Sequence, residues 1–340
     1  MKVSRVHAIL GLLLALGLLL AVGYTDNDTP QPPPAAAVSG ATPYSEHEGK
    51  TAGVKSTAQM QAERGESHYT QSINREAGVL VQSQGHWWRT VRNGPVTFFG
   101  GWLLVLVPAL ILAFYRMFGP LRLHGEPTGR LMQRFDRQER LLHWMTAGSF
   151  VILGLTGLII LFGKHLLIPV VGHQAFSWFP VIAKNIHNLL GPLFFISLLL
   201  LFSRYVKDNL WHKVDWLWVR DAHNVLRGHA HVPSYKFNAA EKAWFWGGVT
   251  LLGLVVSLSG FVLDFPTFEQ GRQVMQIANL VHVVGAILFM AGACGHIYMG
   301  TIGADGALEA MKTGMVDETW AKEHHELWYE ALKAGQDKRA

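Results

Sequence analysis

Four of the seventeen histidines lie where their side chains could do redox chemistry. His143 and His187 open two long apolar stretches, and His282 and His296 both lie within the last such stretch. An ionisable group at membrane depth is costly and marks a functional site by default, although a hydrogen bond between helices would also explain a single buried histidine. Their number and spacing favour a shared role as ligands.

The two histidines of the last stretch face the same side of one helix. Positions 282 and 296 are 14 residues apart, which at ~100° and ~1.5 Å per residue puts both imidazoles within about 40° of one face and about 21 Å apart along the axis. His143 then pairs in depth with His296, and His187 pairs with His282. Two pairs at two levels are the ligand set of two stacked b-type haems, whose filled axial positions suit electron transfer. A zinc site would need three or four ligands at one point.

Five apolar segments must position these histidines. Half of the 340 residues are apolar and 16% are charged, and the apolar residues are gathered in long runs. That composition is typical of a membrane protein, and each run is long enough to cross a ~30 Å hydrocarbon layer as a helix. The predicted helices are centred on 98–118, 141–163, 187–206, 244–264 and 276–301. The last four form the core that carries the histidines.

Basic residues in the loops orient the helices. Residues 116–140 and 204–242 carry six and seven Lys and Arg residues, whereas 164–186 and 265–275 carry two and one. The two basic loops are therefore expected to face the cytoplasm. His143 and His296 then lie near the cytoplasmic face, and His187 and His282 near the outer face. Five tryptophans fall at segment ends, as aromatics at the membrane interface do: Trp102, Trp144, Trp178, Trp244 and Trp246.

The N-terminal part has a different composition. Lys2 and Arg5 precede an apolar run that ends near Gly23, so residues 1–23 resemble a secretory signal peptide or an uncleaved anchor. The polar, Pro-rich stretch that follows is expected to be loosely ordered. The further predicted parts are a periplasmic extension at 24–95, an additional transmembrane helix at 96–118, a basic cytoplasmic loop at 119–140, a four-helix dihaem domain at 141–303 and a cytoplasmic tail at 304–340.

From about Phe135 to Trp328 the sequence resembles the gamma, or cytochrome b, subunit of respiratory formate dehydrogenase. The resemblance is carried by Arg140-Leu141-Leu142-His143-Trp144, Ile186-His187 with Gly191, Tyr235 to Lys242, the His282 to His296 spacing followed by Ile297-Tyr298-Met299, and Lys322-Glu323-His324-His325 with Trp328-Tyr329. It implies two haems b, held by His143, His187, His282 and His296. It also implies that the outer haem receives electrons from an iron–sulfur beta subunit, which a molybdenum or tungsten alpha subunit reduces by oxidising formate, and that the inner haem reduces a quinone.

The resemblance further implies a quinone site. The family's Asn-Ala-Gly-Gln-Lys stretch is Asn238-Ala239-Ala240-Glu241-Lys242 here, which departs from it at two positions. The implied contacts are Asn238, Ala240 and Glu241. Asn238 followed three residues later by Glu241 is also a capping-box pattern for the start of a helix, and the two interpretations are compatible.

These patterns predict an all-α integral membrane protein with a four-helix transmembrane dihaem cytochrome b core and one extra N-terminal transmembrane helix. We expect a multi-pass protein of the inner (plasma) membrane that transfers electrons but has no formate-oxidising site, because Cys294 is its single cysteine and any iron–sulfur cluster must belong to a partner. The basic residues form no single tract, so nucleic-acid binding is not expected. The alternatives are the cytochrome b of a nickel–iron hydrogenase or related molybdoenzyme, and a haem-free anchor or proton-relay protein.

Overall fold

The computed structural model describes residues 83–335, except residues 226, 229–230 and 269. The predicted signal segment at 1–23, and the predicted extension before residue 83, lie outside the described residues. Five helical stretches of the described part are long and apolar enough to cross a bilayer: Gly85–Phe118, Arg137–Leu166, Trp178–Tyr205, Ala239–Asp264 and Arg272–Gly303. The predicted fold class, an all-α membrane protein, is confirmed.

The first stretch starts earlier than the sequence indicated. It consists of α3 (Ser83–Val91), η3 (Arg92–Val96) and α4 (Thr97–Phe118), so the last residues of the predicted polar extension are helical. From Phe99 onward α4 packs on α12 (Arg272–Tyr298), where a Cβ at Gly100 would collide with the side chain of Ile287. Further along, Tyr298 meets the ring of Phe114 edge-on. The extra helix is thus joined to the core through a glycine and an aromatic contact.

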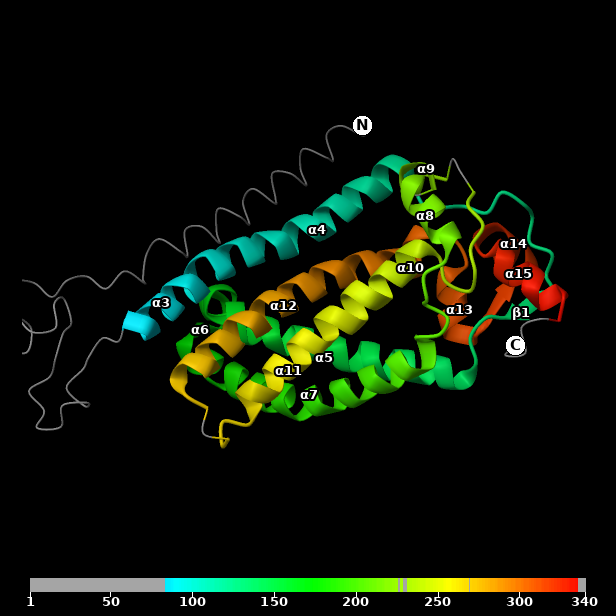
Figure 1. Ribbon diagram of the computed structural model, residues 1–340. Coiled ribbons are helices and arrows are strands. Elements are labelled where there is room, and N and C mark those ends of the chain that lie inside the picture. Colours follow the sequence, from blue (N-terminus) through cyan, green and yellow to red (C-terminus); the bar gives the residue numbers. More distant parts are fainter. Residues whose placement is uncertain (1–82, 226, 229–230, 269, 336–340) are drawn as a thin grey trace, which may run out of the picture. The chain divides into compact units, whose positions relative to one another are not determined.

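Four long helical stretches run side by side in the core (Figure 1). They are α5 (Arg137–Leu166), α7 (Trp178–Tyr205), the continuous run α10 (Ala239–Ala243), η4 (Trp244–Leu252) and α11 (Gly253–Asp264), and α12 with its extension η5 (Met299–Gly303). The short helix α6 (Ile168–Phe176) links α5 to α7. A capping box between Asp136 and Glu139 starts α5, so the helix begins in polar sequence ahead of its apolar run. His143 therefore lies inside α5 and not at its first residue. His187 likewise lies inside α7, which begins at Trp178.

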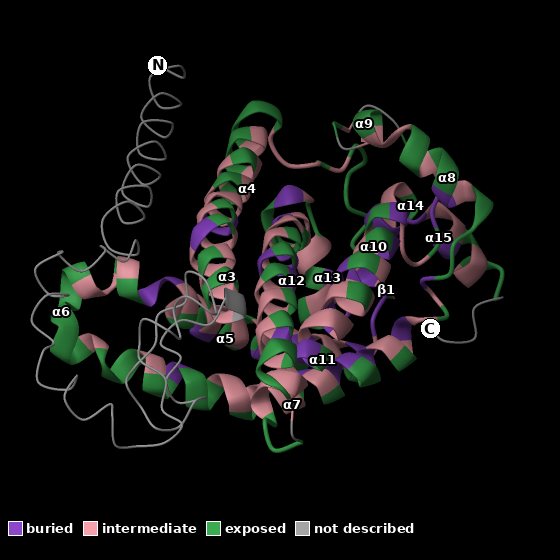
Figure 2. Cartoon of the chain, turned by 60° about the vertical axis from the view of Figure 1, so that its left-hand side comes forward, coloured by how far each residue is buried: buried purple, intermediate pink, exposed green. Residues whose placement is uncertain are grey.

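Apolar side chains cover the outside of the core, while small hydroxyls turn inward. Leu155, Leu189 and Leu258 are more than half exposed, and Figure 2 shows that exposed and intermediate residues cover most of the long helices. Thr156 and Ser197 are buried, and each hydroxyl donates to a carbonyl of its own helix. This distribution suits a lipid environment, in which apolar exposure costs little and an unpaired polar group costs several kcal/mol, roughly.

The described residues of 119–136, 206–238 and 304–335 form a folded unit at one end of the bundle, which we call the end module. Its strands β1 (Leu131–Gln133) and β2 (Met315–Asp317) pair antiparallel. Its helices are α8 (Lys213–Arg220), α9 (Ala222–Val225), α13 (Ala307–Thr313), α14 (Glu318–His324) and α15 (Glu326–Lys333). Its buried core includes Phe135, Tyr205, Val316, Trp320 and Trp328. Residues 304–335, which we expected to be a tail, therefore supply much of a hydrophobic core.

Gly314 makes the turn that joins α13 to β2. Its φ of +89° is in the left-handed region that favours glycine. Its carbonyl accepts hydrogen bonds from the backbone N–H groups of Arg134 (2.8 Å) and Phe135 (3.1 Å). A Cβ at this position would collide with the carbonyl oxygen of Phe135. The turn thus fixes how the C-terminal segment meets the start of α5.

We predict that Gly314→Ala destabilises the protein more than Gly129→Ala does. Both positions have a positive φ, but a Cβ at Gly129 would meet nothing within 4 Å. Each alanine should cost about 1–2 kcal/mol for the left-handed backbone, and Gly314→Ala roughly 1–3 kcal/mol more for the collision. Thermal unfolding of the detergent-solubilised variants measures the difference. Equal melting temperatures would contradict the proposed role of the turn.

A second prediction concerns His325, which is 1% exposed and donates from Nδ1 to the carbonyl oxygen of Tyr235 at 2.7 Å. Burial, helped by the positive charge of Arg134, lowers the pKa of His325 from 6.5 to about 3. Because the unfolded chain takes up this proton first, the stabilisation is complete above pH 6.5 and is lost as the pH falls toward 3.

Between pH 7 and pH 5 the loss should be roughly 2 kcal/mol from this residue. His325→Asn keeps a donor for the Tyr235 carbonyl but cannot titrate, so its stability should depend less steeply on pH over this range. Unfolding of both proteins at several pH values measures the slopes. Identical slopes would show that His325 is not responsible.

Candidate functional site

The structure brings the four membrane histidines together as two pairs. His143 of α5 faces His296 of α12, with ring centroids 6.1 Å apart. His187 of α7 faces His282 of α12, with ring centroids 6.0 Å apart. These are the pairs expected from their depths in the sequence. The pairs lie at two levels of the bundle because α12 contributes one histidine to each.

The separation within each pair fits one metal ion between two axial imidazoles. A metal–nitrogen bond of ~2.0 Å, plus ~1.1 Å from that nitrogen to the ring centre, puts two such ring centres ~6.2 Å apart. Among the described residues no group of three or more His, Cys, Asp and Glu side chains could hold a metal ion. The geometry therefore suits a two-ligand haem site and not a zinc site made by the protein alone.

Hydrogen bonds orient the outer pair for ligation. The ring of His282 donates from Nδ1 to the carbonyl oxygen of Val256 at 2.9 Å. In the same way Nδ1 of His187 lies 2.8 Å from the hydroxyl oxygen of Thr156, whose own proton goes to the carbonyl of Ile152. An Nδ1–H donor leaves the lone pair on Nε2, which is the usual state of a metal-binding histidine. The Val256 carbonyl thus fixes His282 in the tautomer that a haem iron requires, and the Thr156 hydroxyl favours the same tautomer of His187.

The inner pair has different surroundings. Nδ1 of His143 is buried and has no hydrogen-bond partner among the described residues, so this ring is not oriented by a hydrogen bond as the outer rings are. The ring of His296 is exposed and stacks on Trp244, at 5.2 Å between centroids and 14° between planes. Trp244 was expected at the membrane interface, but it lies against this histidine.

Three phenylalanines fill the bundle between the two levels. Phe289 lies seven residues from both His282 and His296, midway along the same face of α12. Its ring is 4.7 Å from that of Phe150 and 6.3 Å from that of Phe194. Phe194 and Phe289 are buried. This apolar layer separates the histidine pairs and excludes water from the space between them.

The glycines near the histidines differ in what surrounds them. A Cβ at Gly191, one turn after His187, would meet nothing within 4 Å, so there is open space beside the outer pair. A Cβ at Gly285 would press on Val255 and Val256, and one at Gly292 would press on Trp244. Gly191 therefore fits close approach of a macrocycle, whereas the other two serve helix packing.

The predicted quinone segment begins α10. The Asn238 side chain accepts from the backbone N–H of Glu241 (3.0 Å), and the Glu241 carboxylate accepts from that of Asn238 (2.8 Å), which confirms the capping-box interpretation. Glu241 also pairs with Arg134 at 2.9 Å and lies 3.9 Å from Nε2 of His325. Ala240 is exposed. One turn further on, the ring of Trp244 stacks on that of His296. The segment therefore adjoins the inner pair.

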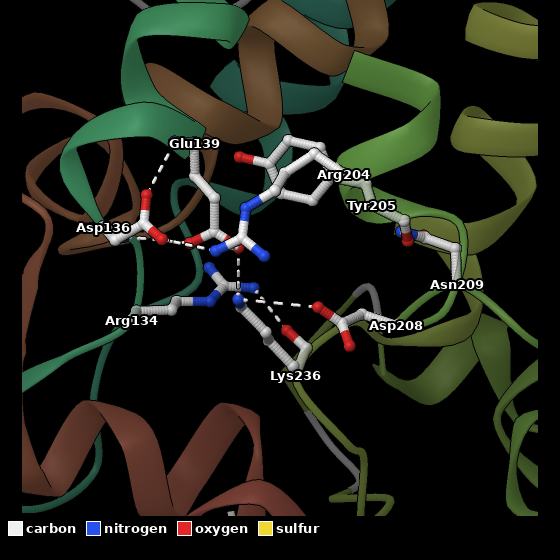
Figure 3. A network of polar contacts seen from close by, with 8 residues as sticks. All are labelled: Arg134, Asp136, Glu139, Arg204, Tyr205, Asp208, Asn209 and Lys236. Carbon is white, nitrogen blue, oxygen red and sulfur yellow. Dashed lines mark hydrogen bonds and ion pairs between the residues drawn. The ribbon is translucent and has the colours of Figure 1, made fainter. Parts of the chain in front are cut away.

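Charged residues surround the start of α5 in a network that Figure 3 shows. The carboxylate of Glu139 is 2% exposed and accepts from Nζ of Lys236 at 2.8 Å. Asp136 pairs with Arg204. Burial alone would raise the pKa of Asp136, but hydrogen bonds from the Glu139 backbone and from Arg204 lower it overall. Several basic residues that the loop count used for orientation are thus held in internal ion pairs.

Three contacts of the histidines were missed from the sequence: Thr156, Ser259 and Trp244. Ser259 lies 3.3 Å from Nδ1 of His282. A signal was present, because each hydroxyl residue precedes a glycine inside an otherwise apolar helix. Hydroxyls are common in membrane helices as packing residues, so that pattern is weak without the structure.

The sequence of this chain is similar to those of known proteins. The family pattern of prokaryotic cytochrome b561 matches residues 134–314, which contain all four histidines. The formate dehydrogenase cytochrome b556(fdo) subunit of Escherichia coli K12 is 28% identical over 215 residues, which cover 61% of this chain and 96% of that protein. The nitrate-inducible cytochrome b556(Fdn) subunit of the same strain is 27% identical over 59% of this chain and 91% of its own length. The formate dehydrogenase cytochrome b556 subunit of Haemophilus influenzae is 30% identical over 56% and 79%. The chain therefore belongs to the prokaryotic cytochrome b561 family and is a membrane cytochrome b.

Proposed function

We propose that this chain is the cytochrome b subunit of a membrane-bound formate dehydrogenase and that it passes electrons through two haems b to a membrane quinone. The observation that carries the proposal is the presence of two imidazole pairs with ring centroids 6.1 and 6.0 Å apart. The names of its relatives supply the partner enzyme. A molybdenum or tungsten alpha subunit would oxidise formate and reduce an iron–sulfur beta subunit, since the single cysteine of this chain cannot hold an iron–sulfur cluster.

The direction of transfer follows from the loop charges. The end module contains both basic loops, which the positive-inside rule assigns to the cytoplasm. His187 and His282 would then accept electrons at the outer face, and His143 and His296 would deliver them at the inner face. Moving one charge across the membrane is worth about 2.3 kcal/mol per 100 mV. Inward electron flow with proton uptake from the cytoplasm would therefore store energy.

Each part of the site has a role in this proposal. Haem bound between two imidazoles would supply one-electron transfer without an open position for substrate. The four histidines orient it, and the layer around Phe289 keeps water from the space between the levels. Asn238 and Glu241 lie beside Trp244 and the inner pair, where a reduced quinone needs protons. Glu241 is a carboxylate that can take and release a proton there.

The electron donor of the complex can be identified by testing which substrate reduces its haems. Membranes that contain the complex should show reduced b-type haem spectra when formate is added. Reduction by hydrogen and not by formate would indicate the cytochrome b of a nickel–iron hydrogenase. The absence of any haem spectrum from purified chain would favour the haem-free anchor or proton-relay alternative. Identification of the co-purifying subunits gives an independent answer.

We predict that alanine at any of the four histidines lowers haem content. Each substitution removes one of two axial ligands, so the pyridine haemochrome yield should fall from two haems per chain to about one. The measurement is haem per purified protein. His173→Ala and His223→Ala are suitable controls, because both histidines are exposed and lie in short helices outside the four-helix core. Both variants should keep two haems per chain. Full occupancy in His282→Ala or His296→Ala would overturn the ligand assignment.

A further prediction concerns Glu241. Glu241→Gln keeps an oxygen for the capping box but removes the charge and the ion pair with Arg134. Haem content and reduction by formate should be unchanged, whereas reoxidation by a quinone analogue should slow at least tenfold, because general acid–base groups contribute about 10²-fold or more. Stopped-flow absorbance of the haems measures both phases.

Asp317→Asn is the matched control for this variant. Asp317 also caps a helix of the end module through its carboxylate, and asparagine caps as well as aspartate does. It should reoxidise at the normal rate. If Glu241→Gln also reoxidises normally, the proposed quinone site is wrong, although the haem assignment would stand.

A further inference from the structure

Two helices present the same short pattern to the outer histidine pair. On α5 the pattern is Thr156-Gly157, and on α11 it is Ser259-Gly260. In both cases the hydroxyl lies near Nδ1 of a histidine on the next long helix. In both cases the glycine lies against the Cε1 atom of that same ring. The two halves of the outer site are thus built alike although they come from different parts of the chain.

On α5 the close contact is the hydroxyl. Thr156 Oγ1 lies 2.8 Å from Nδ1 of His187, and it donates its own proton to Ile152 at 2.9 Å. With that proton on a backbone carbonyl, the oxygen is free to accept from Nδ1–H. The same hydroxyl also lies 3.0 Å from the carbonyl oxygen of Leu153. A Cβ at Gly157 would be 3.5 Å from Cε1 of His187, so the ring edge rests on the backbone of α5.

On α11 the close contact is a carbonyl. Nδ1 of His282 donates to Val256 at 2.9 Å, and the hydroxyl of Ser259 is 3.3 Å away. The hydroxyl proton of Ser259 goes to Val255 at 2.6 Å. A Cβ at Gly260 would be 3.3 Å from Cε1 of His282. On α11 the carbonyl is thus closer to the histidine ring than the hydroxyl is.

The inner pair is built without this device. The Nδ1 atom of His143 has no hydrogen-bond partner in the part of the chain that the structure describes. Its partner His296 stacks on an indole ring. A hydrogen bond from Nδ1–H increases the electron density that an imidazole donates through Nε2. Stronger donation favours ferric over ferrous iron, so it lowers a haem's reduction potential.

We propose that Thr156 is a positioning residue of the outer site: its hydroxyl fixes His187 in the Nδ1–H tautomer and lowers the midpoint potential of the haem bound there, with Ser259 acting more weakly on His282. This inference rests on the proposed function, because it needs a haem between His187 and His282. It concerns the redox balance between the two levels and not the identity of the electron donor.

The test is a spectroelectrochemical titration of the purified complex with Thr156→Val. Valine keeps the shape of threonine but removes the acceptor. Haem content should stay at two per chain, the midpoint of one haem should move to a more positive potential, and the electron paramagnetic resonance signal of that ferric haem should shift. Thr156→Ser restores an acceptor and should restore both readouts. Ser259→Ala should shift the same haem less, because the Val256 carbonyl remains at 2.9 Å.

Thr146→Val is the matched control. Thr146 is buried on the same helix, and its hydroxyl bonds the Leu142 carbonyl at 2.9 Å. This variant should leave the outer haem's midpoint unchanged. Two normal haems with unshifted midpoints in Thr156→Val would overturn the inference while leaving the proposed function intact, as would an equal shift in Thr146→Val. A purified wild-type chain without haem would instead overturn the proposed function.

Discussion

The lack of water in the bilayer interior is the constraint on which the rest of this structure depends. A polar atom there must find its partner within the protein, since an unpaired group costs several kcal/mol, roughly. The buried hydroxyls of Thr146, Thr156 and Ser197 bond carbonyls of their own helices. The histidines meet in pairs, and the two outer rings have acceptors for Nδ1. Among the described residues, Nδ1 of His143 departs from this rule, as do the hydroxyls of Thr250 and Ser257.

The same constraint collects the charges at one end. Lys242 is completely buried and pairs with Asp215 at 2.7 Å, and Glu139 pairs with Lys236. Such pairs add little net stability, because desolvation offsets most of the attraction, but breaking one leaves a buried charge at a cost of about 3–5 kcal/mol. Their effect is to fix geometry. They tie the segment that carries Glu241 to the loops, and so hold that carboxylate beside the inner histidine pair.

Helical periodicity explains why the histidine pairs could be predicted. Any residues fourteen apart share a helix face, so the sequence specified two levels on α12, and antiparallel helices specified the partners. The ends of the helices were harder to predict. The first turn of α5 is polar, and hydropathy identifies only the apolar part of a helix. Residues 304–335 have no long apolar run, yet their scattered aromatics, including Trp320 and Trp328, form a core with residues from distant loops. The contacts of Trp244 and Thr156 depend on which helices pack against each other. Local sequence patterns do not give that information.

The position of the C-terminal segment has a consequence for how the chain is made. Phe135 and Tyr205 leave the ribosome long before Trp320, Ala321 and Trp328, which complete the hydrophobic core around them. The backbone N–H groups of Arg134 and Phe135 likewise lack their acceptor until Gly314 has been made. The hydrophobic core of the end module can therefore be completed only after residues 304–335 have been made. Until then the long helices with their paired histidines can already be inserted while this core is open, which leaves time for a cofactor or a partner subunit to dock.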